Sequence, residues 1–97
     1  MPHWLYVLTP PRQTFRDDMT DEESEIMARH FRFLQALLEQ GTLVLAGPSL
    51  RPLFGISIFE AEDETAARVL MEADPAVSTG LQTAELHPFR VSLLRGA

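Results

Sequence analysis

The longest periodic pattern of the chain lies between residues 20 and 41. At about 100° per residue, apolar side chains fall on one broad arc of a helix, and charged or polar side chains fill the rest. The apolar set is Ile26, Met27, Phe31, Phe33, Leu34, Leu37 and Leu38. His30 falls inside the same arc. A titratable ring is therefore expected to point to the interior of the protein.

The ends of this helix carry recognisable signals. Thr20 followed by Glu23 matches a capping box, in which each side chain bonds the other residue's backbone N–H. Acidic residues crowd the first turn, where the helix dipole favours them. Gly41 is the expected stop, because glycine readily adopts the left-handed conformation that ends helices.

Other segments alternate between strand and helix patterns. Apolar, aromatic and β-branched runs predict strands at 3–8, 42–46, 54–60 and 83–94, and a second apolar stripe predicts a helix at 63–73. Asp74 and Pro75 predict the cap and first residue of a short helical turn that stops at Gly80. A turn is expected at Gly47-Pro48, a connection at 49–54 and a polar loop at 9–19.

The order strand, helix, strand, strand, helix, strand defines the fold class. Each strand–helix–strand half needs a crossover, and the two middle strands pair locally. We therefore predict an α+β, ferredoxin-like βαββαβ domain over residues 1–97. Its four-stranded sheet is antiparallel, and its two main helices cover one face.

The strands are apolar on both faces. In strand 3–8, Trp4, Tyr6 and Leu8 alternate with Leu5 and Val7. In strand 42–46, Leu43 and Leu45 are expected on one side, with Val44 and Ala46 on the other. Two helices cover only one face, and soluble monomers rarely expose a large apolar patch. We therefore predict a homodimer in which the second faces of two sheets pack together.

Composition narrows the function classes. The chain has 97 residues, a net charge of −6, no cysteine, and eight basic residues that are all arginine. The arginines are scattered, which argues against nucleic acid binding. No run of about 18 apolar residues predicts a membrane span, and the N-terminus resembles a strand rather than a secretion signal. We expect a cytoplasmic protein without thiolate metal sites.

His30 has two interpretations. It is either a core histidine satisfied by a carbonyl or water, or a proton-transfer group in a pocket. The second needs an orienting partner. Asp74 is the best candidate, because the second helix is expected beside the first. Asp74 is also a helix cap, and one carboxylate has lone pairs for both roles. His3 and His87 lie on different strands, which is weak evidence for a metal site.

These segments resemble the YCII-related proteins of the dimeric α+β barrel group. The resemblance rests on LYVL, ARHFRFLQALLEQG, LVLAGP, GISIFE, AARVLMEADPAVSTG and the strand around HPF, and covers nearly the full length. It implies a His–Asp dyad, which corresponds to His30 and Asp74 by motif position. Some members of the family act on chlorinated aromatics, in dehydrochlorination that resembles muconolactone isomerisation.

The resemblance implies an enzyme in which Asp74 orients His30 for general acid–base catalysis on a small cyclic or aromatic-derived substrate. Such a lyase or isomerase needs no cofactor, and no phosphate or metal motif is present. Candidate substrate-binding residues are Arg12, Phe15, Gly47, Pro48 and Phe54, and Arg16 also lies in the loop expected at the pocket mouth. Two alternatives remain: a dimeric binding protein without turnover, and a structural dimer whose His–Asp pair satisfies buried polarity.

Overall fold

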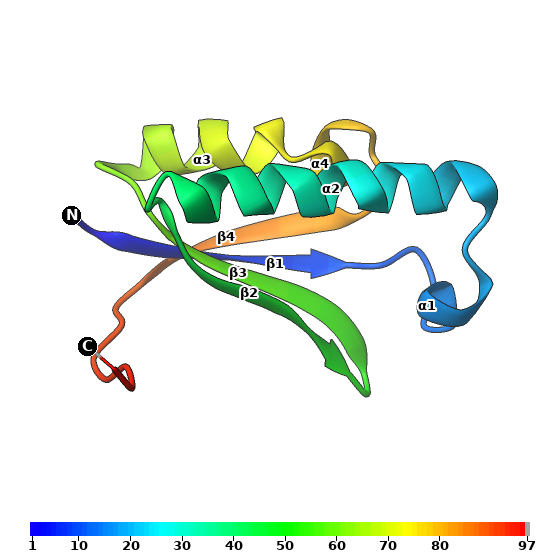
Figure 1. Ribbon diagram of the computed structural model, residues 1–97, viewed down its shortest axis with the longest axis horizontal. Helices are drawn as coiled ribbons and strands as arrows, with labels where there is room; N and C mark the ends of the chain where they lie inside the picture. The colour runs from blue at the N-terminus through cyan, green and yellow to red at the C-terminus, as the bar shows by residue number, and fades with distance from the viewer. Residues whose placement is uncertain (97) are drawn as a thin grey trace.

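The computed structural model describes residues 1–96. The strands are β1 (His3–Thr9), β2 (Leu43–Leu50), β3 (Leu53–Glu60) and β4 (Thr83–Phe89). The helices are α1 (Phe15–Asp18), α2 (Asp21–Glu39), α3 (Glu64–Ala73) and α4 (Pro75–Ser78). Figure 1 shows α2, α3 and α4 together on one side of the sheet and the C-terminal segment on the other.

The sheet has the strand order β2-β3-β1-β4, and every neighbouring pair is antiparallel. β1 thus lies beside β4, the last strand of the second half, and β3 lies beside β2, the last strand of the first half. This arrangement confirms the predicted α+β, ferredoxin-like fold with both main helices on one face.

The core lies between the helices and the sheet face that carries Trp4, Tyr6 and Leu8. Leu34 of α2 and Met71 of α3 pack against these residues. The apolar arc of α2 is wider than the core needs. Phe31 and Leu38 expose 61% and 56% of their surface, so this edge of the helix faces outward beside the core.

The predicted ends of α2 are confirmed. Thr20 and Glu23 form both hydrogen bonds of the capping box. At the other end Gly41 has a φ of +80°, a conformation that costs glycine little. The N–H groups of Gly41 and Thr42 donate to the carbonyls of Leu38 and Leu37, as in a Schellman motif. The helix direction is therefore fixed at both ends.

The turn expected at Gly47-Pro48 is wrong, because both residues lie within β2 and pair with Ile56 and Gly55. The connection expected at 49–54 is also mostly strand, since β2 and β3 run to a tight turn at Arg51-Pro52. The physical reason is that β2 is an edge strand. Proline lacks an N–H, which an edge strand tolerates.

The alternation expected for strand 42–46 is also wrong. The register shifts between Leu43 and Leu45, so Leu43 opposes Phe59 whereas Leu45 opposes Ile58. Leu43 is buried on the helix side, and Leu45 exposes 39% of its surface on the other. An extra residue at Val44 produces this switch, as a β-bulge does.

Two further boundaries differ from the sequence prediction. The last strand ends at Phe89 rather than at residue 94, and Pro88 lies on this edge strand as expected. The loop at 9–19 contains the short helix α1, whose Phe15 is buried. No helix among residues 1–96 is long and apolar enough to cross a membrane.

Within the described residues 1–96, no helix covers the second face of the sheet (Figure 1). Leu5 of β1 opposes Ile58 of β3 there, and Val7 opposes Ile56. Ile58 is buried, with 7% of its surface exposed, whereas Leu5, Val7 and Ile56 are half-buried. This face is therefore apolar at its centre.

Candidate active site

An open, mostly apolar cleft of about 710 Å³ lies along α2. Its walls are α2 and the β2–β3 hairpin, and α1 contributes Phe15 and Arg16. The wide apolar arc of α2 explains the cleft, because its outward edge forms one wall. Phe31 and Leu38, which the core leaves exposed, both line it.

His30 lies on the wall that α2 forms, and its ring contacts Asp74. Nδ1 of His30 is 2.8 Å from both Oδ1 and Oδ2 of Asp74. The His30 side chain exposes 14% of its surface, and Asp74 is fully buried. The two predicted dyad residues, 44 positions apart in the chain, are thus brought into direct contact.

Local sequence explains how Asp74 reaches this place. Asp74 ends α3 and caps α4, accepting a hydrogen bond from the Ala76 N–H at 2.9 Å. Pro75 occupies the first position of α4, where its missing N–H costs nothing. Because α4 packs against α2, the cap carboxylate faces the His30 ring. The cap and the dyad use the same carboxylate, as the sequence allowed.

A third donor comes from β1. The Tyr6 hydroxyl donates to Oδ2 of Asp74 at 2.7 Å, and Tyr6 is fully buried. Burial raises the pKa of Tyr6 well above its usual range, and the Asp74 carboxylate raises it further. Tyr6 therefore stays protonated and remains a donor. Three N–H and O–H groups thus surround a carboxylate that water does not reach.

These contacts fix the state of the imidazole. A carboxylate only accepts hydrogen bonds, so the proton of neutral His30 is assigned to Nδ1. Nε2 then carries the free lone pair. Within residues 1–96 the structure gives Nε2 no hydrogen-bond partner, and it leaves no buried side-chain nitrogen or oxygen unpaired. Nε2 is therefore open to the cleft.

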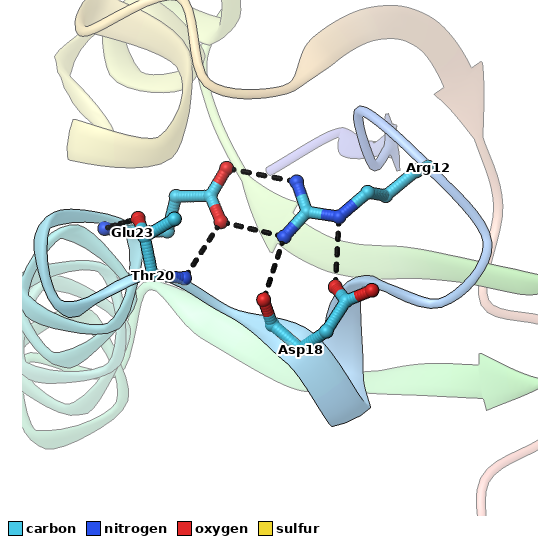
Figure 2. A network of polar contacts seen from close by, with 4 residues as sticks. All are labelled: Arg12, Asp18, Thr20 and Glu23. Atoms are coloured by element: carbon cyan, nitrogen blue, oxygen red, sulfur yellow. Dashed lines mark hydrogen bonds and ion pairs between the residues drawn. The ribbon is translucent and has the colours of Figure 1, made fainter.

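A network of charged groups holds the loop beside the cleft (Figure 2). The Arg12 guanidinium donates to both Glu23 oxygens, at 2.7 and 3.0 Å, and to Oδ1 of Asp18 at 2.7 Å. It also lies over the Phe15 ring, with its central carbon 5.5 Å from the ring centroid. The hydrogen bonds from Arg12 and from the Thr20 N–H lower the pKa of Glu23 to about 2. The network ties α1 to the start of α2.

The structure places four of the five predicted substrate-binding residues on the cleft wall: Phe15, Gly47, Pro48 and Phe54. Arg12 does not line the cleft, and its donors are taken by Glu23 and Asp18. Arg16, four residues later in the chain, lines it instead. Sequence spacing alone did not separate these two arginines, because their difference lies in which one meets a carboxylate.

Sequence reasoning missed three polar residues. It treated Tyr6 only as an apolar residue of the first strand, and it did not single out Ser57 or Gln82, which are buried and line the cleft. Only Tyr6 could have been identified from the sequence. It alternates in phase with Trp4 and Leu8, so its side chain was expected in the core, where a tyrosine hydroxyl usually has a hydrogen-bond partner.

The side chains around the cleft offer few metal ligands. Among residues 1–96 no three His, Asp or Glu side chains gather closely enough to hold a metal ion. His30 and Asp74 alone make two ligands, fewer than the three or four protein ligands of zinc sites. The arrangement instead suits proton transfer at Nε2.

Comparisons with known proteins place the chain in a family. No curated protein matches its sequence. A similar solved structure is that of 5-chloro-2-hydroxyhydroquinone dehydrochlorinase TftG from Burkholderia phenoliruptrix AC1100, in complex with 2,5-dihydroxybenzoquinone. The TM-score is 0.69 at 16% identity, over 91% of this chain and 93% of that one, which shows a shared fold. The model of the YCII-related domain matches residues 5–90, so the chain belongs to the YCII-related family.

Proposed function

We propose that this protein is a small-molecule enzyme in which His30 transfers a proton and Asp74 orients it. One observation carries the proposal. Nδ1 of His30 is 2.8 Å from a fully buried carboxylate, while its other nitrogen is open to an apolar cleft. An imidazole held in this way is a general base whose conjugate acid is stabilised by the carboxylate behind it.

The proposed reaction is a dehydrochlorination or an isomerisation. Nε2 takes a proton from a carbon of the substrate. In dehydrochlorination the electron pair of the broken C–H bond forms a new π bond to the neighbouring carbon as the C–Cl bond breaks, and chloride leaves with its electrons. In isomerisation the pair moves towards an adjacent carbonyl, whose oxygen becomes an enolate, and His30 returns the proton to another carbon of that enolate. Positioned acid–base catalysis of this kind contributes about 10² to 10⁴ in rate.

The substrate class follows from the cleft and from the structural neighbour. The cleft of about 710 Å³ is in the size range of small-molecule sites, and most of its lining is apolar. The neighbour of similar fold is a dehydrochlorinase of a chlorinated hydroquinone. Both support a small cyclic or aromatic-derived substrate, held by Phe15, Gly47, Pro48 and Phe54. Arg12 supports this wall from behind.

The proposal includes a homodimer in the cytoplasm that binds neither nucleic acid nor membranes. The uncovered apolar face of the sheet supports the dimer, because water contact with such a face is unfavourable. The scattered arginines and the net charge of −6 support the lack of nucleic acid binding. The proposed chemistry uses no cofactor.

The test is a turnover assay on the purified protein with 5-chloro-2-hydroxyhydroquinone, followed by chloride release, and with muconolactone, followed by proton exchange into heavy water. His30→Gln should lower turnover by at least about 10²-fold. Asp74→Asn should also lower it, because the amide no longer fixes the tautomer. His87→Gln is the matched control, since this histidine lies half-exposed on β4 outside the cleft.

Stability measurements separate the alternatives. If the pair is structural, His30→Ala removes one of the three donors to a buried carboxylate and should lower the free energy of unfolding by about 1.5–3 kcal/mol. If the site is catalytic and open, the variant should fold nearly normally and lose turnover. Ligand binding without any turnover of either substrate would favour the binding protein. Turnover that survives in His30→Gln would contradict the proposal.

A further inference from the structure

The ionisable side chains that line the cleft are all of the basic type. The chain carries 14 Asp and Glu residues and a net charge of −6. None of these acids lines the cleft, and Asp74 lies behind the His30 ring. Within residues 1–96 the only side chains there that can be cationic are Arg16 and His30. A ligand in this cleft therefore meets positive charge on an acidic protein.

Arg16 is placed for contact with a ligand. It lies on α1, which the Arg12 network fixes against the start of α2 (Figure 2). The Phe15 side chain, buried beneath Arg12, anchors the same turn. The segment before it is held to the hairpin as well, because the Gln13 side chain pairs with both backbone groups of Leu53, at 3.0 and 2.6 Å. The backbone that carries Arg16 is thus tied at both sides of the cleft.

The two arginines of this segment differ in their partners. Arg12 is paired with Glu23 and Asp18. Arg16 forms no ion pair among residues 1–96, and its side chain is exposed at the cleft. A guanidinium presents several donors in one plane and binds carboxylates and similar anions with two hydrogen bonds. The Arg12 guanidinium uses these donors to bind Glu23 and Asp18 of the protein itself. The Arg16 guanidinium can use them to bind a ligand in the cleft.

We infer that Arg16 is a specificity residue that selects a small cyclic anion, with the negative charge at Arg16 and the reacting carbon at His30. The inference rests on the proposed function and names its substrate class: a ring that carries an enolate, phenolate or carboxylate oxygen. The apolar walls accept the ring, and the guanidinium accepts the charge. Neutral rings of the same shape lack the charge interaction with the Arg16 guanidinium and bind more weakly.

The test is a binding titration by NMR on the full chain with two matched pairs of probes. One pair is 2,5-dihydroxybenzoquinone, which is an enolate at neutral pH, and its neutral dimethyl ether. The other is benzoate and neutral benzamide. We expect each anion that binds to bind more tightly than its neutral partner. Arg16→Gln should weaken anion binding by about tenfold, as loss of a charge-assisted hydrogen bond does, and leave neutral probes unchanged.

Arg29→Gln is the control, because it removes the same charge from an exposed position on α2 that does not line the cleft. It should leave the affinity for both anions unchanged. Added salt should weaken anion binding to the wild type more than to Arg16→Gln, because exposed charges are screened. Binding of one anion class only would identify whether an enolate or a carboxylate is preferred, and supports the inference.

The inference would be overturned by equal loss of anionic and neutral probes in Arg16→Gln, by equal loss of anion affinity in Arg29→Gln, or by no preference for anions in the wild type. Absence of binding by all four probes at millimolar concentration would overturn it too. Arg16-dependent anion binding without turnover of any substrate would leave this inference standing and remove the proposed enzyme. Turnover by the wild type, with anion affinity unchanged in Arg16→Gln, would leave the proposed enzyme standing and remove this inference.

Discussion

Asp74 is a carboxylate that water does not reach and that three donors surround. Tyr6, His30 and the Ala76 N–H occupy its oxygens at 2.7 to 2.9 Å. Such a group is stable only while its partners stay in place, because an unpaired buried charge is costly. The Tyr6 hydroxyl therefore helps to hold the carboxylate that contacts His30.

Tyr6→Phe tests this role. The ring should keep its packing against Phe59, whose centroid lies 5.7 Å away, while the hydrogen bond to Asp74 is lost. We expect the free energy of unfolding to fall by about 1.5–3 kcal/mol, the range for hydrogen bonds to charged groups. Urea denaturation followed by fluorescence measures the change. An unchanged midpoint would show that Asp74 does not depend on this donor.

At the scale of elements, α1 and α2 are joined by one side chain. Arg12 binds Glu23 at the first turn of α2 and Asp18 at the end of α1 (Figure 2). Glu23 also completes the capping box with Thr20. One carboxylate thus serves the helix start and the loop beside the cleft, so its protonation should loosen both.

Acid should remove the contribution of the Glu23 carboxylate to the free energy of unfolding over a defined pH window. The pKa of Glu23 is about 2 in the folded protein, against an ordinary value of 4.5. Because the folded value is the lower one, the contribution is complete above about pH 4.5 and is lost as the pH falls towards 2. The wild type should therefore be more stable than Glu23→Gln at pH 7, with the difference shrinking across this window.

Urea denaturation at several pH values measures this difference. Glu22→Gln is the control, since Glu22 is an exposed acid of the same helical turn outside the Arg12 network. Its stability relative to the wild type should change little over the same window. A Glu23→Gln difference that persists unchanged at the acid end would contradict the network.

The sequence predicted most elements because their signals are local. The capping box of α2, its glycine stop and the Asp74-Pro75 cap each depend on a few neighbouring residues, and all three are confirmed. The turn at Gly47-Pro48 was wrong because the fold places these residues on an edge strand, where proline is tolerated. Edge position is a property of the sheet and not of the segment.

The candidate site was predictable in part. The contact between His30 and Asp74 could be predicted, because His30 interrupts an apolar arc and Asp74 caps a helix that the topology brings alongside. The role of Tyr6 was not predictable, because it depends on which carboxylate the hydroxyl meets after folding. Arg12 and Arg16 could not be told apart, because only the fold shows that Arg12 meets Glu23 and Asp18 while Arg16 lines the cleft. The bulge at Val44 also escaped prediction, since it arises from pairing between strands.

At the scale of the whole molecule, the proposed dimer would cover the second face of the sheet. Leu5, Val7 and Ile56 are the half-buried apolar residues of the uncovered sheet face. His3 and Glu60 lie at its margin, where Nε2 of His3 is 3.7 Å from Oε1 of Glu60. Leu5→Lys places a charge on this face and should convert the dimer to a monomer. Sedimentation velocity measures the mass of both proteins.

Val69→Lys is the matched control, because Val69 exposes 67% of its surface on α3, across the molecule from the uncovered face. This variant should remain a dimer. A wild-type protein that sediments as a monomer, or a Leu5→Lys protein that stays dimeric, would remove the proposed interface.

The central claim is that Asp74 holds His30 with its proton on Nδ1 and its free lone pair on Nε2. The most direct measurement is the tautomer of neutral His30 from nitrogen NMR shifts of the labelled protein, in the wild type and in Asp74→Asn. We expect the Nδ1–H form to dominate in the wild type and to diminish in the variant, whose amide has one acceptor oxygen for three donors. A wild-type ring protonated at Nε2 would leave no base in the cleft and would contradict the account.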